Sequence, residues 1–598
     1  MRMGVLIGAV LLWAHVTRAW QLDPSAYVTR WASEVSPTNA HPEYPRPMMT
    51  RPDWLNLNGL WECGLTRGTD APSFTGQILV PFPIESPLAG ERRTLNEFER
   101  FWYRRTFTIP PGWQGRRVLL HFDAVNWESE VWINGQEIGT HKGGYDQFSF
   151  DVTEMLRPGQ EQELTVAVRN PSDAGPQPRG KQMLRPRPPF YRTSSGIWQT
   201  VWLEPVAETS IEALHLAPEL DKRTLSIEVS GRGNTNMAVV EAIAYVQGKE
   251  ISRAKGRVGE SFQLRIRNVR PWSPEDPFLY DLKVILSEKG RKVDEVSSYF
   301  GMRKVSVAKG ADGHPRLYLN DKPYFELGVL DQGYWPDGLY TAPNDEALRS
   351  DAKLIRDLGF NLCRVHVKVE PERWYYWCDK LGILVWQDMP NGDDAATPQK
   401  KEINKDPKSA RQFETELSRM IAGHWNHPSI LIWIPFNQGW GQYDTVRITE
   451  LVKKLDPSRL VIDASGWNDF GVGDVRSLHQ YPGPAPLEED GHRACVIGEC
   501  GGLGMAVSGH LWSVMTYWNT TVFDSSDALA AGYESLAARL RDEEGPGLSG
   551  AVVTGLTDVE SECDGFITYD RAILKMPEAK VKLANQDILS FSNKSGGH

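Results

Sequence analysis

The segment 361–389, NLCRVHVKVEPERWYYWCDKLGILVWQDM, carries the pattern that decides the fold of this chain. Its two apolar runs, 361–367 and 383–389, have the length and composition of buried strands. Between them, 371–381 is an amphipathic stretch with helical periodicity. A helix between two buried strands is the repeating unit of a parallel sheet.

The same alternation continues on both sides of this segment. The apolar runs lie at 324–330, 361–367, 383–389, 430–437, 460–465, 477–481, 496–499 and 548–556. The helical patterns lie at 345–358, 371–381, 410–424 and 443–455. Eight strands alternating with helices over this length predict a (β/α)8 TIM barrel.

The hydrophobic pattern before residue 306 is different: it predicts short strands with alternating polar and apolar residues and shows no helical period. Residues 54–205 include the hairpin signal Asn134-Gly135 and predict a jelly-roll-like β-sandwich. Residues 206–305 have the length and strand spacing of an immunoglobulin-like β-sandwich. The predicted organisation is a signal peptide at 1–19, a sugar-binding-like sandwich at 20–205, an immunoglobulin-like sandwich at 206–305, the barrel at 306–590 and a disordered tail at 591–598.

The first residues resemble a secretory signal. Arg2 precedes a short apolar run at 3–13, and Thr17-Arg18-Ala19 is typical of a cleavage site. We therefore expect a secreted protein, extracellular or periplasmic. A net charge of −11 argues against nucleic acid or an anionic membrane as the main partner. The six cysteines form no metal-binding pattern, and we expect most of them to be buried free thiols.

Polar and aromatic residues gather where the predicted barrel strands end. A TIM barrel places its site at these C-terminal ends, so we expect these side chains to surround one pocket. The histidines are scattered along the sequence, and we predict neither a metal nor a cofactor. The candidate site residues are Arg364, His366, Trp386, Asp388, Asn437, Gln438, Trp440, His479, Tyr481 and Glu499.

These motifs resemble those of glycoside hydrolase family 2, the family of β-galactosidases, β-glucuronidases and β-mannosidases. The resemblance covers nearly the whole chain after the signal segment, and the motifs keep the family's order and spacing. It implies a carbohydrate substrate and leaves homo-oligomerisation open. The other motifs that carry it are RPDWLNLNGLW at 51–61, SGIWQ at 195–199, FGMR at 300–303, TDVE at 557–560 and GFITYDR at 565–571.

The resemblance implies two catalytic glutamates, of which this chain retains one. In VIGE at 496–499, Glu499 matches the nucleophile of a retaining mechanism. In PFNQGWGQ at 435–442, Gln438 stands where the family has its acid/base glutamate. An amide has no proton to give at neutral pH and cannot act as a general base.

Three interpretations follow from Gln438. The chain is a working hydrolase of slow or unusual kind, a carbohydrate-binding protein that does not cleave, or a transglycosidase whose glycosyl ester is resolved by an external nucleophile. We favour hydrolysis. In a hydrolase, another group or an acidic leaving group takes over the acid role. The nearest carboxyl groups by strand position are Asp331, Glu370, Asp388 and Asp558.

The remaining residues have roles only through the resemblance. Asn437 resembles the residue that binds the sugar 2-hydroxyl, and Tyr481 one that contacts the nucleophile. Arg364 and His366 resemble polar residues that line the sugar pocket, although for His366 a hydrogen-bonded rim histidine is an equal alternative. Trp386 and Trp440 either pack on a sugar face or belong to the core. Asp388 either orients Arg364 or binds substrate, and His479, at the end of the sixth run, is expected to bind substrate.

The substrate is expected to be a neutral β-glycoside such as a galactoside. The family's glucuronidases have an Asn-x-Lys pair just before the segment that corresponds to Gly565 here. This chain has Glu562 and Asp564 at those two positions, and their charge disfavours a sugar carboxylate.

Overall fold

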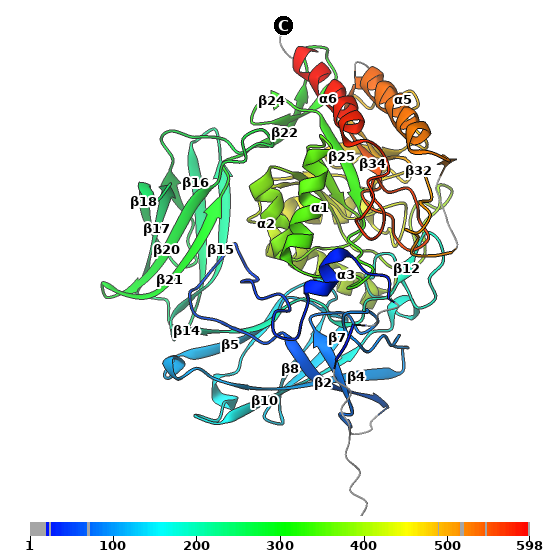
Figure 1. Ribbon diagram of the computed structural model, residues 1–598. Helices are drawn as coiled ribbons and strands as arrows, with labels where there is room; N and C mark the ends of the chain where they lie inside the picture. Colours follow the sequence, from blue (N-terminus) through cyan, green and yellow to red (C-terminus); the bar gives the residue numbers. More distant parts are fainter. Residues whose placement is uncertain are drawn as a thin grey trace, which may run out of the picture.

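The computed structural model describes residues 20–22, 26–68, 72–487, 489–514, 520–544 and 547–595, and the predicted signal peptide at 1–19 lies outside them. Figure 1 shows two β-structures, at the bottom and at the left, and a barrel with its helices at the upper right. This arrangement confirms the predicted fold class of two sandwiches followed by a barrel.

The N-terminal sandwich packs two antiparallel sheets around a shared apolar core. The sheet orders are β3-β2-β4-β10-β7-β8 and β1-β14-β5-β9. The predicted turn at Asn134-Gly135 joins β7 to β8 with φ values of 53° and 80°, as a type I′ turn requires. The strands are β1 (Leu55–Asn56), β2 (Gly59–Arg67), β3 (Gly76–Val80), β4 (Glu99–Thr108), β5 (Arg117–Phe122), β7 (Glu128–Ile133), β8 (Gln136–Lys142), β9 (Phe148–Asp151), β10 (Glu161–Arg169) and β14 (Val201–Val206).

The second sandwich has a three-stranded sheet, β15-β16-β19, and a four-stranded sheet, β18-β17-β20-β21. Alternate residues of these strands are buried and form its separate core. The strands are β15 (Ser210–Glu219), β16 (Thr224–Arg232), β17 (Ala238–Val246), β18 (Lys249–Arg257), β19 (Phe262–Arg265), β20 (Tyr280–Glu288) and β21 (Arg291–Phe300).

The barrel sheet has eight parallel strands in the order β29-β28-β27-β26-β25-β34-β31-β30. Ser465, in the segment that follows β29, forms a parallel bridge with Ser477 of β30, which brings the two ends of the sheet together. Each of the eight predicted runs overlaps one of these strands, and five of the runs contain the whole strand. The strands are β25 (Glu326–Asp331), β26 (Leu362–Val365), β27 (Leu384–Asp388), β28 (Ile430–Ile434), β29 (Leu460–Val461), β30 (Val475–His479), β31 (Ala494–Gly501) and β34 (Leu548–Thr554).

The four predicted helices are present as α1 (Asp345–Asp357), α2 (Glu372–Leu381), α3 (Pro407–His424) and α4 (Thr445–Leu455). Two more, α5 (Ser526–Glu544) and α6 (Glu578–Ser595), pack side by side (Figure 1). Helix α6 corrects the prediction of a disordered tail for 591–595, because the helix continues to Ser595. Residues 596–598 of that tail lie outside the described residues.

No helix in the described part of the chain is both long and apolar enough to cross a bilayer. All six cysteines are buried and free, as predicted.

Candidate active site

Glu499 lies in strand β31, where the ladder to β34 is interrupted between Ile497 and Cys500. The residue before it, Gly498, has no room for a side chain. A Cβ there would lie 2.2 Å from Ser477 Oγ and 2.5 Å from Ser465 Oγ. The glycine of the VIGE motif therefore lets the strand ends of β29 and β30 close tightly beneath Glu499.

The Glu499 carboxylate is 3% exposed and accepts from three side chains on three other strand ends. Arg364 Nη1 donates to Oε1 at 3.3 Å. Tyr481 Oη donates to Oε2 at 2.7 Å, and Gln438 Nε2 lies 3.4 Å from the same oxygen. These contacts fix the orientation of the carboxylate.

The surroundings of Glu499 keep it ionised. Burial acts to raise its pKa, but His479 and His366, which carry charge at the low pH where Glu499 titrates, together with Arg364 outweigh burial and hold the pKa well below its ordinary range. Burial also lowers the pKa of His479 to about 4 and lowers that of His366, so both rings are neutral at pH 7. Arg364 is therefore the permanent positive charge beside the carboxylate.

Arg364 is fully buried and connects the site residues from behind. Its Nε and Nη2 donate to both oxygens of Asp388, each at 3.0 Å. Nη2 also donates to Asn437 Oδ1 at 2.8 Å. Asn437 Nδ2 in turn lies 3.0 Å from His366 Nε2. Asp388 has no exposed surface. Of its two predicted roles, the structure therefore favours orienting Arg364 over binding substrate.

Gln438 stands in a backbone conformation that favours glycine, with φ of 52°. Its N–H donates to Ser465 O at 2.8 Å, which ties the end of β28 to the end of β29. Its side-chain Nε2 lies 3.2 Å from His479 Nδ1. Because that nitrogen accepts, His479 donates from Nε2 to Ser465 Oγ at 2.8 Å. His479 thus holds the amide beside the Glu499 carboxylate.

A pocket opens above Glu499 and receives residues from both the barrel and the N-terminal sandwich. Among the predicted residues, His366, Gln438, Trp440, Tyr481 and Glu499 line it, whereas Arg364, Asn437 and His479 form the layer behind. The other lining residues are Lys181, Pro189, Leu330, Gln332, Thr554, Gly555, Thr557, Glu562 and Asp564.

Lys181 is the charged pocket residue that sequence reasoning missed, because it comes from a long loop of the sandwich, residues 171–192, which is rich in proline and arginine. Gly180 anchors this loop by donating its N–H to Asn391 O at 2.8 Å. Its φ is 61°, and a Cβ would lie 2.3 Å from Val367 O, so only glycine fits. A long irregular loop gives no periodicity from which this approach could be predicted.

The lysine is paired inside the pocket. Lys181 Nζ lies 3.5 Å from Glu562 Oε2 and 3.2 Å from Tyr191 Oη, and Tyr191 Oη also donates to Glu562. Burial raises the pKa of Glu562 to about 7, and burial likewise raises the pKa of Asp564. The pocket thus holds two carboxyl groups besides Glu499, against one lysine.

Trp386 lies elsewhere. It is fully buried in the barrel interior, where its Nε1 donates to Glu326 Oε2 at 2.5 Å. Its side chain cannot reach a sugar in the pocket. Of the two predicted roles for Trp386, core packing is therefore the one that fits, and substrate binding does not. Trp440 does line the pocket and stacks on Phe190 with 5.2 Å between ring centroids.

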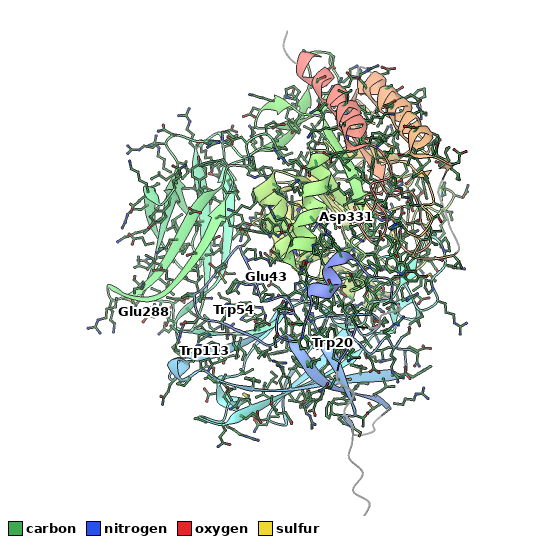
Figure 2. All side chains as sticks on the ribbon, viewed as in Figure 1. Trp20, Glu43, Trp54, Trp113, Glu288 and Asp331 are labelled. Atoms are coloured by element: carbon green, nitrogen blue, oxygen red, sulfur yellow. The ribbon has the colours of Figure 1, made fainter. Side chains whose placement is uncertain are left out.

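None of the carboxyl groups considered as replacement acids lines the pocket. Asp331, labelled in Figure 2, is buried at the end of β25 and accepts from Gly333 N at 2.9 Å. Glu370 faces a different cavity, which it lines together with Asp123 and His424. Asp558 is ion-paired with Lys575 at 2.5 Å. The carboxyl groups that share the pocket with Glu499 are instead Glu562 and Asp564.

Comparison with known protein families gives three matches in chain order. The sugar binding domain of glycosyl hydrolases family 2 matches residues 53–203, a second domain of that family matches 209–303, and its TIM barrel domain matches 316–476. Together they cover roughly two thirds of the chain.

Curated relatives have two different names. A putative β-glucuronidase of Formosa agariphila is 28% identical over 405 residues, 64% of this chain and 46% of its own length. A β-galactosidase of Thermoanaerobacter pseudethanolicus is 26% identical over 372 residues, 60% of this chain and 47% of its own length. The chain therefore spans about half the length of these relatives.

Solved structures share the fold at low identity. A β-D-glucuronidase of Dictyoglomus thermophilum superposes with a TM-score of 0.73 at 19% identity, covering 91% of this chain and 98% of the other. A β-glucuronidase of Bifidobacterium dentium, complexed with coumarin-3-O-glucuronide, gives a TM-score of 0.72 at 21% identity and covers 91% of this chain and 98% of the other.

Proposed function

The chain belongs to glycoside hydrolase family 2, and from this premise we propose that it cleaves the O-glycosyl bond of a neutral β-glycoside with retention of configuration. The main support is the Glu499 carboxylate, which is ionised, oriented by Arg364 and Tyr481, and lines a pocket. A retaining mechanism requires such a carboxylate as its nucleophile.

In the first step, Glu499 attacks the anomeric carbon, and the bond from that carbon to the leaving oxygen breaks. The leaving group keeps the bonding electron pair and departs as an anion, because the Gln438 amide has no proton to give. The product of this step is a glycosyl ester on Glu499. The hydrogen bonds from Arg364 and Tyr481 are released in part as the carboxylate loses its charge.

In the second step, water attacks the same anomeric carbon and the ester bond to Glu499 breaks. The water proton passes to solvent, since Gln438 cannot accept it, and Glu499 returns to its carboxylate form. Two inversions give net retention. Without a general base this step is slow, by about 10²–10⁴-fold for a typical acid/base residue.

The preference for a neutral glycone follows from the pocket charges. Two carboxyl groups, Glu562 and Asp564, outnumber the single cation, and Lys181 is already paired with Glu562. A sugar carboxylate would enter against this excess of negative charge. Sugar hydroxyls can instead donate to both carboxylates.

Replacing Glu562 by glutamine should shift this preference. The variant Glu562→Gln removes the negative charge beside Lys181, so the lysine can pair with a sugar carboxylate. We expect the ratio of kcat/KM for 4-nitrophenyl β-glucuronide to that for the β-galactoside to rise by at least about tenfold at pH 8. The wild type should show the same trend as the pH falls through about 7, because Glu562 then becomes protonated.

The matched control is Glu560→Gln. Glu560 lies two residues away and accepts from the Arg192 backbone at 2.9 Å, outside the pocket lining. A ratio that Glu562→Gln leaves unchanged, or that Glu560→Gln raises equally, would contradict the charge argument.

Gln438 supports a second candidate function. With no acid/base group, a glycosyl ester on Glu499 survives longer, and an external nucleophile such as a sugar hydroxyl can resolve it. If the first step also fails, the pocket binds a glycan without cleaving it. Transglycosylation and binding without turnover are therefore the alternatives to hydrolysis.

The test is covalent labelling with 2,4-dinitrophenyl 2-deoxy-2-fluoro-β-galactoside and its gluco form. Fluorine slows both steps, and dinitrophenolate leaves without an acid, so the ester should accumulate. We expect one adduct per chain by intact-protein mass spectrometry, mapped by peptide analysis to Glu499.

The control for labelling is Glu499→Gln, which preserves the size of the side chain and should take no label. An adduct on a different residue would refute the assignment of Glu499. No adduct with either sugar, in wild-type protein that is folded by circular dichroism, would favour the glycan-binding alternative.

We also propose that the protein is exported. Support comes only from the signal-like segment with Arg2 and the apolar run at 3–13. These residues lie outside the described part of the chain.

A further inference from the structure

Trp467 is a large aromatic side chain that stands half exposed beside the proposed reaction centre. It is 49% exposed, although most tryptophans of the barrel are buried. Its ring meets the His479 ring edge to face, with 6.0 Å between centroids and 79° between planes. His479 in turn contacts both Gln438 and Glu499. One residue therefore separates the indole from the nucleophile.

The backbone on both sides of Trp467 is anchored. Ser465 O accepts from Gln438 N at 2.8 Å, and Gly466 N donates to Ser477 O at 3.2 Å. On the other side, Asn468 O accepts from Gln442 Nε2 at 2.9 Å. The indole is thus presented to solvent by a fixed segment. A fixed, solvent-facing aromatic surface at the edge of a pocket is typical of a ligand contact.

The position of Gln438 identifies the side of the pocket on which Trp467 lies. In a retaining site the acid/base position is on the side of the leaving group, across from the nucleophile. The Gly466 backbone packs on this position, since a Cβ at Gly466 would lie 3.6 Å from Gln438 Cα. Trp467 follows Gly466 directly and packs on His479, so it lies next to the leaving-group side of the pocket although it is not among the residues that line the pocket.

The chemistry at position 438 restricts the leaving group further. Gln438 gives no proton, so the C–O bond breaks readily only when the departing oxygen is stable as an anion. Phenols with electron-withdrawing groups meet this condition, whereas sugar alcohols do not. The same phenols have a flat ring that can stack on an indole.

We infer that Trp467 forms the leaving-group subsite and that this subsite takes a flat, acidic phenol, so that the preferred substrates are aryl β-glycosides. The inference rests on the proposed retaining function and adds the class of leaving group. Trp467 is a specificity-determining residue, because it contacts the aglycone and takes no part in bond breaking.

The experiment compares two substrates that both react without acid assistance, 2,4-dinitrophenyl β-galactoside and β-galactosyl fluoride. Only the first has a ring to stack. In Trp467→Ala we expect kcat/KM for the dinitrophenyl substrate to fall by about two- to tenfold, the range of an aromatic stacking contact, and kcat/KM for the fluoride to stay unchanged. Trp467→Phe should restore most of the loss.

A second measurement needs no turnover and no choice of sugar. Free 2,4-dinitrophenol should bind to the wild type by isothermal titration calorimetry, and binding should weaken by the same factor in Trp467→Ala. The control is Met237→Ala, because Met237 is 72% exposed and lies in the immunoglobulin-like sandwich. It should change neither readout.

The outcomes separate the inference from the function on which it rests. If Trp467→Ala slows both substrates equally or neither, and dinitrophenol binding is unaffected, the subsite is refuted while the retaining function stands. If wild-type protein turns over neither substrate and Glu499 takes no label, the proposed function fails, and the substrate class fails with it.

Discussion

Replacing Gln438 by glutamate is expected to raise kcat/KM for methyl β-galactoside by about 10²–10⁴-fold, the typical contribution of a general acid/base. Glutamate has the size and shape of glutamine, and the backbone at 438 is already fixed by its bond to Ser465 O. The amide nitrogen that the new carboxyl oxygen would replace lies 3.4 Å from Glu499 Oε2. The ionised Glu499 therefore raises the pKa of the new carboxyl group, which keeps it protonated for donation.

The leaving group provides the control for this prediction. Dinitrophenolate needs no proton, so the first step with 2,4-dinitrophenyl β-galactoside should change little in Gln438→Glu. Pre-steady-state release of dinitrophenolate measures that step, and steady-state release of methanol measures the other substrate. Equal acceleration of the first step for both substrates would show that position 438 does not supply the proton.

Replacing Asp388 by asparagine is expected to lower the free energy of unfolding by about 3 kcal/mol, the cost of leaving a buried charge without its partner. Asp388 accepts two hydrogen bonds from Arg364, and neither side chain has exposed surface. The amide can accept only one of these bonds, and its NH₂ group faces the guanidinium. Urea unfolding followed by tryptophan fluorescence measures the change.

Activity should fall together with stability in Asp388→Asn, because Arg364 also holds Glu499 and Asn437. A matched control is Glu250→Gln, which breaks an ion pair with Arg253 on the surface of the immunoglobulin-like sandwich. Solvent screens that pair, and no measurable loss of stability is expected. A similar loss in both variants would mean that burial of the Arg364–Asp388 pair contributes nothing.

The barrel could be predicted from sequence because its strands are buried on both faces. Such strands are continuous apolar runs, and each of the eight runs overlaps a strand. Helix α6 could not be predicted in the same way. One of its buried positions is Asn585, whose amide donates to Leu358 O at 2.9 Å, and this polar residue interrupts the apolar pattern.

The candidate site could be predicted as far as barrel topology determines it. Residues at strand ends, such as His366, Tyr481 and Glu499, come together because parallel strands end at one rim. The predicted sugar contact of Trp386 is wrong. Side chains two residues apart on a strand face the same way but at different depths, so Asp388 reaches Arg364 while Trp386 stays in the core. Lys181 and Trp467 lie on loops, where no periodicity places a side chain.

The loop that carries Lys181 affects how the sandwich and the barrel can evolve. The sandwich contributes Lys181 and Pro189 to the pocket wall, so the border near residue 205 separates two folding units but not two functional ones. Recombination that exchanged the sandwich between paralogues would also exchange the pocket-lining residues that the sandwich contributes. Selection on ligand preference can therefore act on the sandwich loop while the barrel, with Glu499 and Arg364, is inherited unchanged.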